Sequence, residues 1–253
     1  MNLNIPRSII LVFFISLLYW IYLALTTSMN ISCDAIGYEE LGRSLQSKGF
    51  FYYIQHGPSR EPLYPMLISL SMHLESLSGL AYTKIMAFFG VITLMISQGL
   101  LYGILRILNI RTGICVGVLI YFGLSPALLN TAFSLYSEIT TLPIILGIIL
   151  TSHYLWIHLH NNRLKYAYIA SVLLGLLLAS AALMKAVFEV AAPVFFLILF
   201  IILAKNITTQ KRIHFLLCST LALSMFYIPV TTYKWLNYKL NGNYVITNRG
   251  SWA

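Results

Sequence analysis

A small set of ionisable side chains borders the long apolar segments of this chain, where such groups could act on a substrate at a membrane surface. The set consists of Asp34, Arg60, Glu61, Glu138 and Lys185. A positioned carboxylate can act as a general base, which typically accelerates a reaction by about 10²–10⁴-fold. A cation can stabilise the negative charge that grows on a leaving phosphate. The set therefore offers candidate bases and candidate phosphate-binding groups.

Asp34 is the candidate base, because it lies just past the first apolar segment, where a carboxylate can stay ionised while it faces a dehydrated cavity. Aspartate is also a favoured residue at helix N-termini, so Asp34 could simply cap a helix. The two roles are compatible, since one carboxylate oxygen can cap the backbone while the other remains accessible. The sequence leaves both interpretations open.

Glu138 lies at the mouth of a later apolar segment, where it could position a sugar or an acceptor. The alternative is an interfacial glutamate that reaches outward to water. Glu61 stands between Arg60 and Pro62 and could either orient Arg60 for binding or form a purely structural pair with it. Both alternatives remain open for each glutamate.

Lys185 and Arg60 are the candidate phosphate-binding residues. Lysine acts as a point charge, whereas the planar guanidinium of arginine can bind in a bidentate way. Lys185 could instead form an ion pair with Glu189, because the two residues have the i,i+4 spacing of helix neighbours. The histidines show no metal-ligand spacing, so no metal site is predicted from them.

The composition is typical of an integral membrane protein. Of the 253 residues, 59% are hydrophobic and 9% are charged, and the mean hydropathy is +0.82. Soluble domains carry about 25% charged residues, so lipid is the expected solvent. The net charge of +9 fits the basic loops that orient membrane proteins better than it fits binding to nucleic acid.

The apolar runs predict an all-α transmembrane helical bundle with about seven spans. These are Ser8–Leu25, Tyr82–Leu105, Gly113–Leu124, Tyr136–Trp156, Tyr166–Leu183, Ala186–Leu203 and Ile213–Tyr233. The first run has a long apolar core and no small-residue cleavage site after it, which indicates a retained anchor. Gly175, Ala179 and Ala182 share one face of a span and predict close helix packing. We expect residues 1–253 to form a single domain.

The loop charges predict that the amino-terminus is cytoplasmic. With this orientation, the basic loop residues all fall on the cytoplasmic side: Arg7, Arg106, Arg111, Arg163, Lys165, Lys205, Lys211 and Arg212. All seven carboxylates fall in segments on the other face: Asp34, Glu39, Glu40, Glu61, Glu75, Glu138 and Glu189. Membrane insertion does not require this asymmetry of the acidic residues. The asymmetry therefore indicates a function for polar side chains on the outer side.

The outer loop, residues 27–81, is expected to carry two short helices. The first would run from Asp34 to Lys48, with an apolar stripe and with Gly49 as its stop. The second would run from Met66 to Leu77 after Pro65, and about a dozen residues cannot cross a core of about 30 Å. Residues 234–253 are expected to form a last outer segment.

These motifs, in their order, resemble the GT-C superfamily of membrane glycosyltransferases. The resemblance is carried by Asp34 in Ser32–Tyr38, by Arg60–Pro65 at the start of a short helix, by Ser125-Pro126 followed by Ser137-Glu138, and by the Gly-rich span from Gly175 to Lys185. It looks closest to the branch that contains protein O-mannosyltransferases and aminoarabinose transferases. Members usually show Arg-Pro where this chain has Lys185-Ala186.

The resemblance implies transfer of a sugar from a polyprenyl phosphate to a hydroxyl of a lipid, protein or glycan outside the cytoplasm. Asp34 would be the base, and Arg60, Glu61, Glu138 and Lys185 would bind substrate. No cofactor is firmly implied, although some relatives use a divalent metal near this carboxylate. Members continue for several more spans, so we expect the chain to be the amino-terminal part of a longer enzyme.

Two other classes of protein compete with this interpretation. A transporter or lipid flippase would place ionisable groups and helix breaks near mid-span, in two halves related by a repeat. The carboxylates here cluster at one interface instead, and no repeat is visible. A non-catalytic membrane subunit would not need the ordered set of polar residues on one face.

Overall fold

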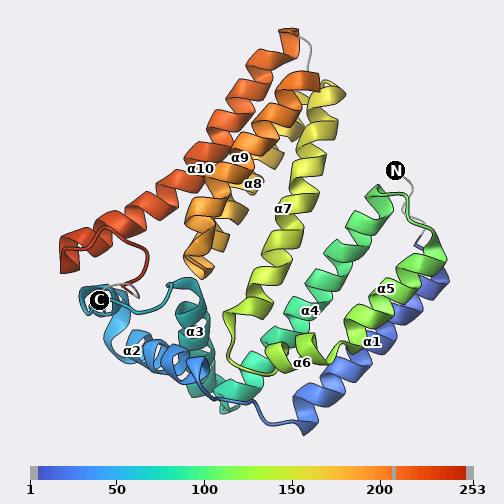
Figure 1. Cartoon of the computed structure of the whole chain (residues 1–253). Coiled ribbons are helices and arrows are strands. Elements are labelled where there is room, and N and C mark those ends of the chain that lie inside the picture. Colours follow the sequence, from blue (N-terminus) through green and yellow to red (C-terminus); the bar gives the residue numbers. More distant parts are fainter. Residues whose placement is uncertain (1–4, 207–208, 249–253) are drawn as a thin grey trace. The chain divides into compact units, whose positions relative to one another are not determined.

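The computed structural model describes residues 5–206 and 209–248, and most of these residues lie in helices (Figure 1). The helices are α1 (Arg7–Thr26), α2 (Asp34–Gln55), α3 (Leu63–Ser78), α4 (Tyr82–Ile107), α5 (Thr112–Leu124), α6 (Pro126–Ala132), α7 (Ser137–His160), α8 (Leu164–Met184), α9 (Val187–Asn206) and α10 (Thr209–Asn241). Within these residues no strand forms, and one isolated bridge joins Asn30 to Ser134. The predicted all-α class is confirmed.

Five helices are long and apolar enough to cross a membrane. They are α1, α4, α7, α8 and the part of α10 from Arg212 to Asn241. The predicted span Gly113–Leu124 is different, because α5 has 13 residues and reaches only about 20 Å at 1.5 Å per residue. The chain then bends by 48° into α6, so the pair is at most one broken span.

The predicted count of seven spans is not confirmed. The described apolar part of α9 is Val187–Ile198, which is shorter than a full span. The predicted outer segment 234–253 stays a prediction: α10 remains helical to Asn241, and residues 249–253 lie outside the described part of the chain. The side chains of Lys205 and Lys211 also lie outside the described set.

The two helices predicted in the loop are present, but their limits differ from the prediction. Gly49 interrupts α2 with φ of 83°, a conformation that glycine adopts without steric cost, as the predicted stop requires. Helix resumes after it up to Gln55, where we expected an extended stretch. α3 begins at Leu63 instead of Met66, and Pro65 lies in its first turn as predicted.

The chain forms two compact units, which are described separately below. Unit 1 comprises Met1–Ser47 and Tyr64–Leu146, and unit 2 comprises Lys48–Leu63 and Gly147–Ala253. The boundary within α2 falls beside the Gly49 kink. The single domain expected from the sequence stays a prediction.

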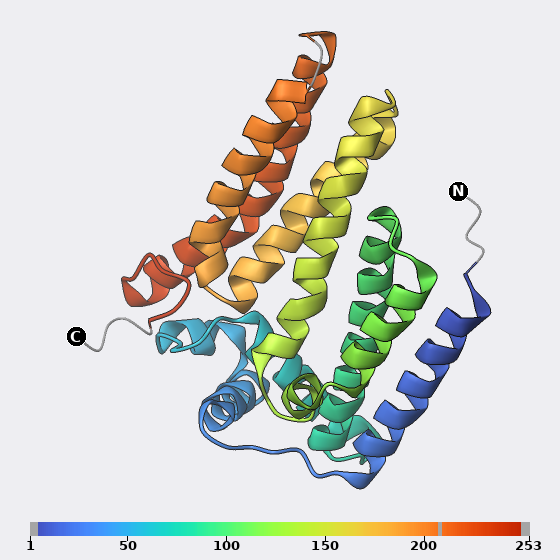
Figure 2. The same cartoon turned by 45° about the vertical axis from the view of Figure 1, so that its right-hand side comes forward.

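In unit 1, α1, α4 and α5 lie side by side (Figure 2). The buried Trp20 indole donates to the Gly123 carbonyl at 2.9 Å, and the Gln98 amide donates to Ser16 and to the Leu119 carbonyl, both at 3.1 Å. Apolar side chains surround these polar contacts. Such interhelical hydrogen bonds stabilise helix pairs in lipid, where the hydrophobic effect between helices is weak.

Three of the basic residues of unit 1 lie near one end of this helix group. Ile9 near the start of α1 belongs to a core cluster with Cys115, against which Leu105 and Ile110 pack. This cluster brings together the chain around Arg7, Arg106 and Arg111. The opposite ends of α1 and α4 meet near Lys84, and the loop that leads to Asp34 starts there.

Unit 2 is built around the close packing of α8 with α10. A Cβ atom added to Gly175 would lie 2.3 Å from the Ala222 carbonyl oxygen, so only glycine fits. This confirms the predicted packing role of Gly175. Tyr168 contacts His214 at the ends near Arg163 and Arg212, whereas Lys234 contacts Glu189 at the other ends.

Candidate functional site

Asp34 opens α2 and its side chain is exposed. The N–H groups of Ala35 and Ile36 bond to the carbonyls of Ser32 and Cys33 and close the first turn. Cys33 has φ of 52°, the left-handed region, which costs a residue with a Cβ about 1–2 kcal/mol. Asp34 thus lies at the positive end of the α2 dipole, immediately after a strained residue. The helix-start role and the base role both fit this position.

Aromatic side chains dock the first turns of α2 against α3 and α7. The hydroxyl groups of Tyr38 and Ser137 are 3.1 Å apart, and the Tyr38 ring meets the Tyr64 ring edge-on with centroids 5.0 Å apart. A Cβ atom on Gly42 would lie 2.5 Å from the Ile68 side chain. The helix that presents Asp34 therefore approaches α3 closely, which only glycine permits.

Glu138 follows Ser137 in the first turn of α7 and is exposed. Burial raises the pKa of Tyr64 well above its ordinary value, and the charges of Tyr38 and Glu138 raise it further. Tyr38 contacts Ser137, the residue before Glu138, so Asp34 and Glu138 belong to the same end of unit 1. That both carboxylates lie on the outer face of a membrane stays a prediction.

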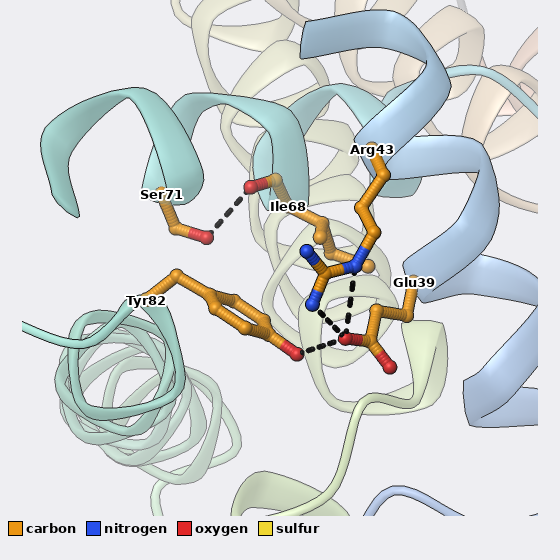
Figure 3. Close-up of polar contacts among 5 residues, drawn as sticks. All are labelled: Glu39, Arg43, Ile68, Ser71 and Tyr82. Carbon is orange, nitrogen blue, oxygen red and sulfur yellow. Dashed lines mark hydrogen bonds and ion pairs between the residues drawn. The ribbon is translucent and has the colours of Figure 1, made fainter. Parts of the chain in front are cut away.

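A polar cluster that the sequence did not single out joins α2 to α4 (Figure 3). One carboxylate oxygen of Glu39 accepts hydrogen bonds from the Tyr82 hydroxyl at 2.6 Å and from the Arg43 Nη2 at 2.7 Å. The Arg43 guanidinium also lies over the Tyr82 ring, 5.7 Å from its centroid. The i,i+4 spacing of Glu39 and Arg43 could have indicated their ion pair, but no local pattern indicates Tyr82.

This cluster changes the acidity of Glu39. Partial burial alone would raise the pKa of its carboxyl, but the hydrogen bonds from Tyr82 and Arg43 and the charge of Arg43 outweigh burial. The pKa of Glu39 is therefore lowered from its ordinary value. The ion pair lies within α2, and the hydrogen bond from Tyr82 to the ionised Glu39 is the contact that joins α2 to α4.

In unit 2, the turn that carries Arg60 and Glu61 is held from several sides. The Tyr53 hydroxyl donates to the Arg60 carbonyl at 2.9 Å. Glu61 is only 6% exposed, and its Oε1 accepts a hydrogen bond from the Ala186 N–H at 2.9 Å. Glu61 therefore touches the backbone directly after Lys185, which brings two predicted site residues together. Its two predicted roles toward Arg60, orientation for binding and a structural pair, stay predictions.

Lys185 is the C-cap residue of α8 and has extended backbone angles, φ −148° and ψ 116°. Residues 185–189 do not form one helical turn, so the geometry assumed for an i,i+4 pair with Glu189 is wrong. Glu189 pairs with Lys234 of α10 instead, at 2.5 Å, and Lys234 lies over the Tyr244 ring. No local pattern in the sequence indicates this pair.

Amide groups of α10 and of the segment after it donate hydrogen bonds to the backbone near the Arg60 turn. Asn241 donates to the Ile54 carbonyl at 3.0 Å and also to Asn237. The Asn248 N–H donates to the Pro58 carbonyl at 3.0 Å. These contacts fix the backbone on both sides of the kinked α2 end and the Arg60 turn, and they depend on residues far away in the sequence.

The predicted site residues thus fall into two groups. Unit 1 carries Asp34 and Glu138, and unit 2 carries Arg60, Glu61 and Lys185. Among the described residues, no three His, Cys, Asp or Glu side chains gather closely enough to hold a metal ion. Comparisons of the chain with protein-family models, curated proteins and solved structures found no match.

Proposed function

We propose that this chain is the membrane-embedded part of a GT-C-type glycosyltransferase, which moves a sugar from a polyprenyl phosphate to an acceptor hydroxyl outside the cytoplasm. The observation that carries the proposal is the sidedness of its polar groups. In unit 1, Asp34 and Glu138 lie at the end opposite Arg7 and Arg106. In unit 2, Lys185 lies at the end opposite Arg163.

The proposed chemistry divides between the two groups of residues. Asp34 takes the proton of the acceptor hydroxyl, and the acceptor oxygen attacks the anomeric carbon of the sugar. The bond from that carbon to the phosphate oxygen breaks, and polyprenyl phosphate leaves with the electron pair. Lys185 and Arg60 stabilise the charge on the phosphate. Glu138 positions a sugar or acceptor hydroxyl, and Glu61 keeps the Arg60 turn beside Lys185.

The proposal includes a topology. The amino-terminus is cytoplasmic, about seven spans cross a bacterial-type plasma membrane, and α2 and α3 lie on the outer face. The acceptor is a lipid, a protein or a glycan, and the proposed step itself uses no metal.

The test uses membranes that contain the complete reading frame and a panel of radiolabelled polyprenyl-phosphate sugars. Loss of label from the donor lipid is followed for the native protein, for Asp34→Asn and for Glu40→Gln. Glu40 is the matched control, because it is an exposed acid on the same helix. We expect one donor to be consumed by the native and Glu40→Gln proteins, and Asp34→Asn to abolish turnover at equal protein level.

Two results would count against the proposal. If no donor turns over, the transferase function is wrong, and transport of the labelled lipid across sealed vesicles becomes the experiment to perform. If a donor turns over and Asp34→Asn retains full activity, the function stands but Asp34 is not the base. An arm with a metal chelator reports whether turnover also needs a divalent ion.

A further inference from the structure

The first turn of α4 holds the end of α1. The Lys84 ammonium donates to three carbonyl oxygens at 2.9–3.0 Å, and the acceptors are Ala24, Leu25 and Thr27. The last carbonyls of a helix have no partner within the helix, and they form the negative end of its dipole. A single ammonium group from α4 therefore donates hydrogen bonds to the carbonyls at the end of α1 and offsets the negative charge of the helix dipole there.

The same turn of α4 also holds α2. Tyr82, two residues before Lys84, donates its hydroxyl hydrogen to Glu39, and Arg43 lies over its ring (Figure 3). Residues 27–33 connect α1 to α2 and are called the strap. In the middle of the strap, the Asn30 N–H donates to the Phe133 carbonyl at 3.2 Å. The strap is thus fixed at both ends and near its centre.

Packing alone does not hold the strap. A cavity of about 330 Å³ lies beside it, lined by Thr27 and Ser28 of the strap and by Lys84. One residue of the strap, Cys33, adopts the left-handed backbone conformation immediately before Asp34. A residue with a Cβ stays in such a conformation only where the surrounding contacts enforce it.

We infer that Tyr82 and Lys84 are positioning residues, which together fix the strap from both sides and thereby set the place of Asp34. The inference rests on the proposed function only where it assigns catalysis to Asp34. Neither residue need touch the substrate. Loss of either anchor lets the strap relax and moves the carboxylate, which lowers the rate of the chemical step without weakening binding of the donor.

The first measurement is the rate at which deuterium labels the Asn30 amide of the strap in membranes. The Asn30 N–H donates to the Phe133 carbonyl, so it exchanges only when the strap opens locally. We expect Tyr82→Phe and Lys84→Met each to raise the labelling rate by about 5-fold or more, because Tyr82→Phe removes one hydrogen bond and Lys84→Met removes three. Trp20→Phe is the control, because it removes a buried hydrogen bond elsewhere in unit 1.

Conservative variants separate the anchors from a general loss of stability. Lys84→Arg keeps a cation beside the carbonyls, and Glu39→Gln keeps an acceptor for the Tyr82 hydroxyl. Both are expected to label at nearly the native rate. If Tyr82→Phe labels like the native protein, or if Trp20→Phe raises labelling as much as Tyr82→Phe does, the inference is overturned.

The second measurement is the KM and kcat for the labelled donor. Misplacement of a reacting group by about 1 Å can cost about 100-fold in rate. We expect kcat to fall about 10- to 100-fold in Tyr82→Phe and in Lys84→Met while the donor KM stays unchanged. Lys84→Arg, which keeps the cation, is expected to have nearly the native kcat. A rise in KM at constant kcat contradicts the positioning role. If the native protein turns over no donor, the proposed function fails, and the labelling result still decides whether the anchors fix the strap.

Discussion

The two units hold their candidate site residues by different kinds of contact. In unit 1, α2 is joined to its surroundings through side-chain pairs, such as Glu39 with Tyr82 and Tyr38 with Ser137. In unit 2, the Arg60 turn is joined through contacts to backbone, such as Glu61 with the Ala186 N–H and Asn241 with the Ile54 carbonyl. The difference indicates that charged and hydroxyl side chains position α2 in unit 1, whereas hydrogen bonds to backbone groups position the Arg60 turn in unit 2.

The largest expected effect tests the assignment of chemistry to unit 1 and of phosphate binding to unit 2. Asp34→Asn should lower kcat by about 10²–10⁴-fold with little change in donor KM, because it removes a general base. Lys185→Met should lower kcat too, because Lys185 stabilises the charge that grows on the phosphate, and it should in addition raise the donor KM by about 10- to 100-fold, because a charge-assisted contact to the bound donor is lost. Steady-state kinetics with the consumed donor measure both. Identical changes in the two variants would contradict the division of roles.

A smaller effect tests the dense packing of unit 2. Gly175→Ala places a Cβ atom 2.3 Å from a backbone oxygen that cannot move independently, so we expect a loss of about 1–3 kcal/mol in stability. Gly99→Ala is the matched control in unit 1, since no atom lies within 4 Å of its added Cβ. Thermal unfolding in detergent should separate the two variants. Equal midpoints would contradict the close contact between Gly175 of α8 and Ala222 of α10.

A comparable test concerns the glutamates of the two units. Glu61→Ala removes a buried acceptor and leaves the Ala186 N–H without it, which should cost about 1–3 kcal/mol. Glu138→Ala changes an exposed side chain and should stay within about 0.5 kcal/mol. Denaturant titration of the purified proteins gives both values. A larger loss for Glu138 than for Glu61 would reverse the comparison.

The smallest expected effect is a dependence of unit 1 on pH. The pKa of Glu39 is lowered in the folded state, so its contribution to stability is present above the unfolded pKa and is lost as the pH falls through the folded pKa. The native protein should therefore exceed Glu39→Gln in thermal midpoint at neutral pH. The advantage should begin to shrink as the pH falls below about 4.3, the ordinary value for glutamate, and should vanish once the pH is below the lowered pKa of the folded state. A constant difference across this range would show that the Glu39 charge contributes nothing.

The sequence predicted the helix breaks and apolar spans that depend on local composition. Gly49 ends the first part of α2, and α1, α4, α7 and α8 lie where the apolar runs predict them. The prediction failed where length and bending decide the outcome, as in the short α5 with its 48° bend into α6. It also failed for the pair of Lys185 with Glu189, because the assumed helix does not continue through Lys185.

The sequence by itself determined that this is an all-helical chain suited to lipid, with its acids and its basic loops in alternate segments. The hydropathy of a segment and the order of charges along the chain depend only on residues that are close in sequence, so both can be predicted without knowledge of the fold. Only the tertiary structure decided three hydrogen bonds: from the Tyr82 hydroxyl to Glu39, from the Lys84 ammonium to the last carbonyls of α1, and from the Ala186 N–H to Glu61. Each of these hydrogen bonds joins residues distant in sequence, and such partners meet only once the apolar faces of the helices have packed and fixed the ends of the chain segments in space.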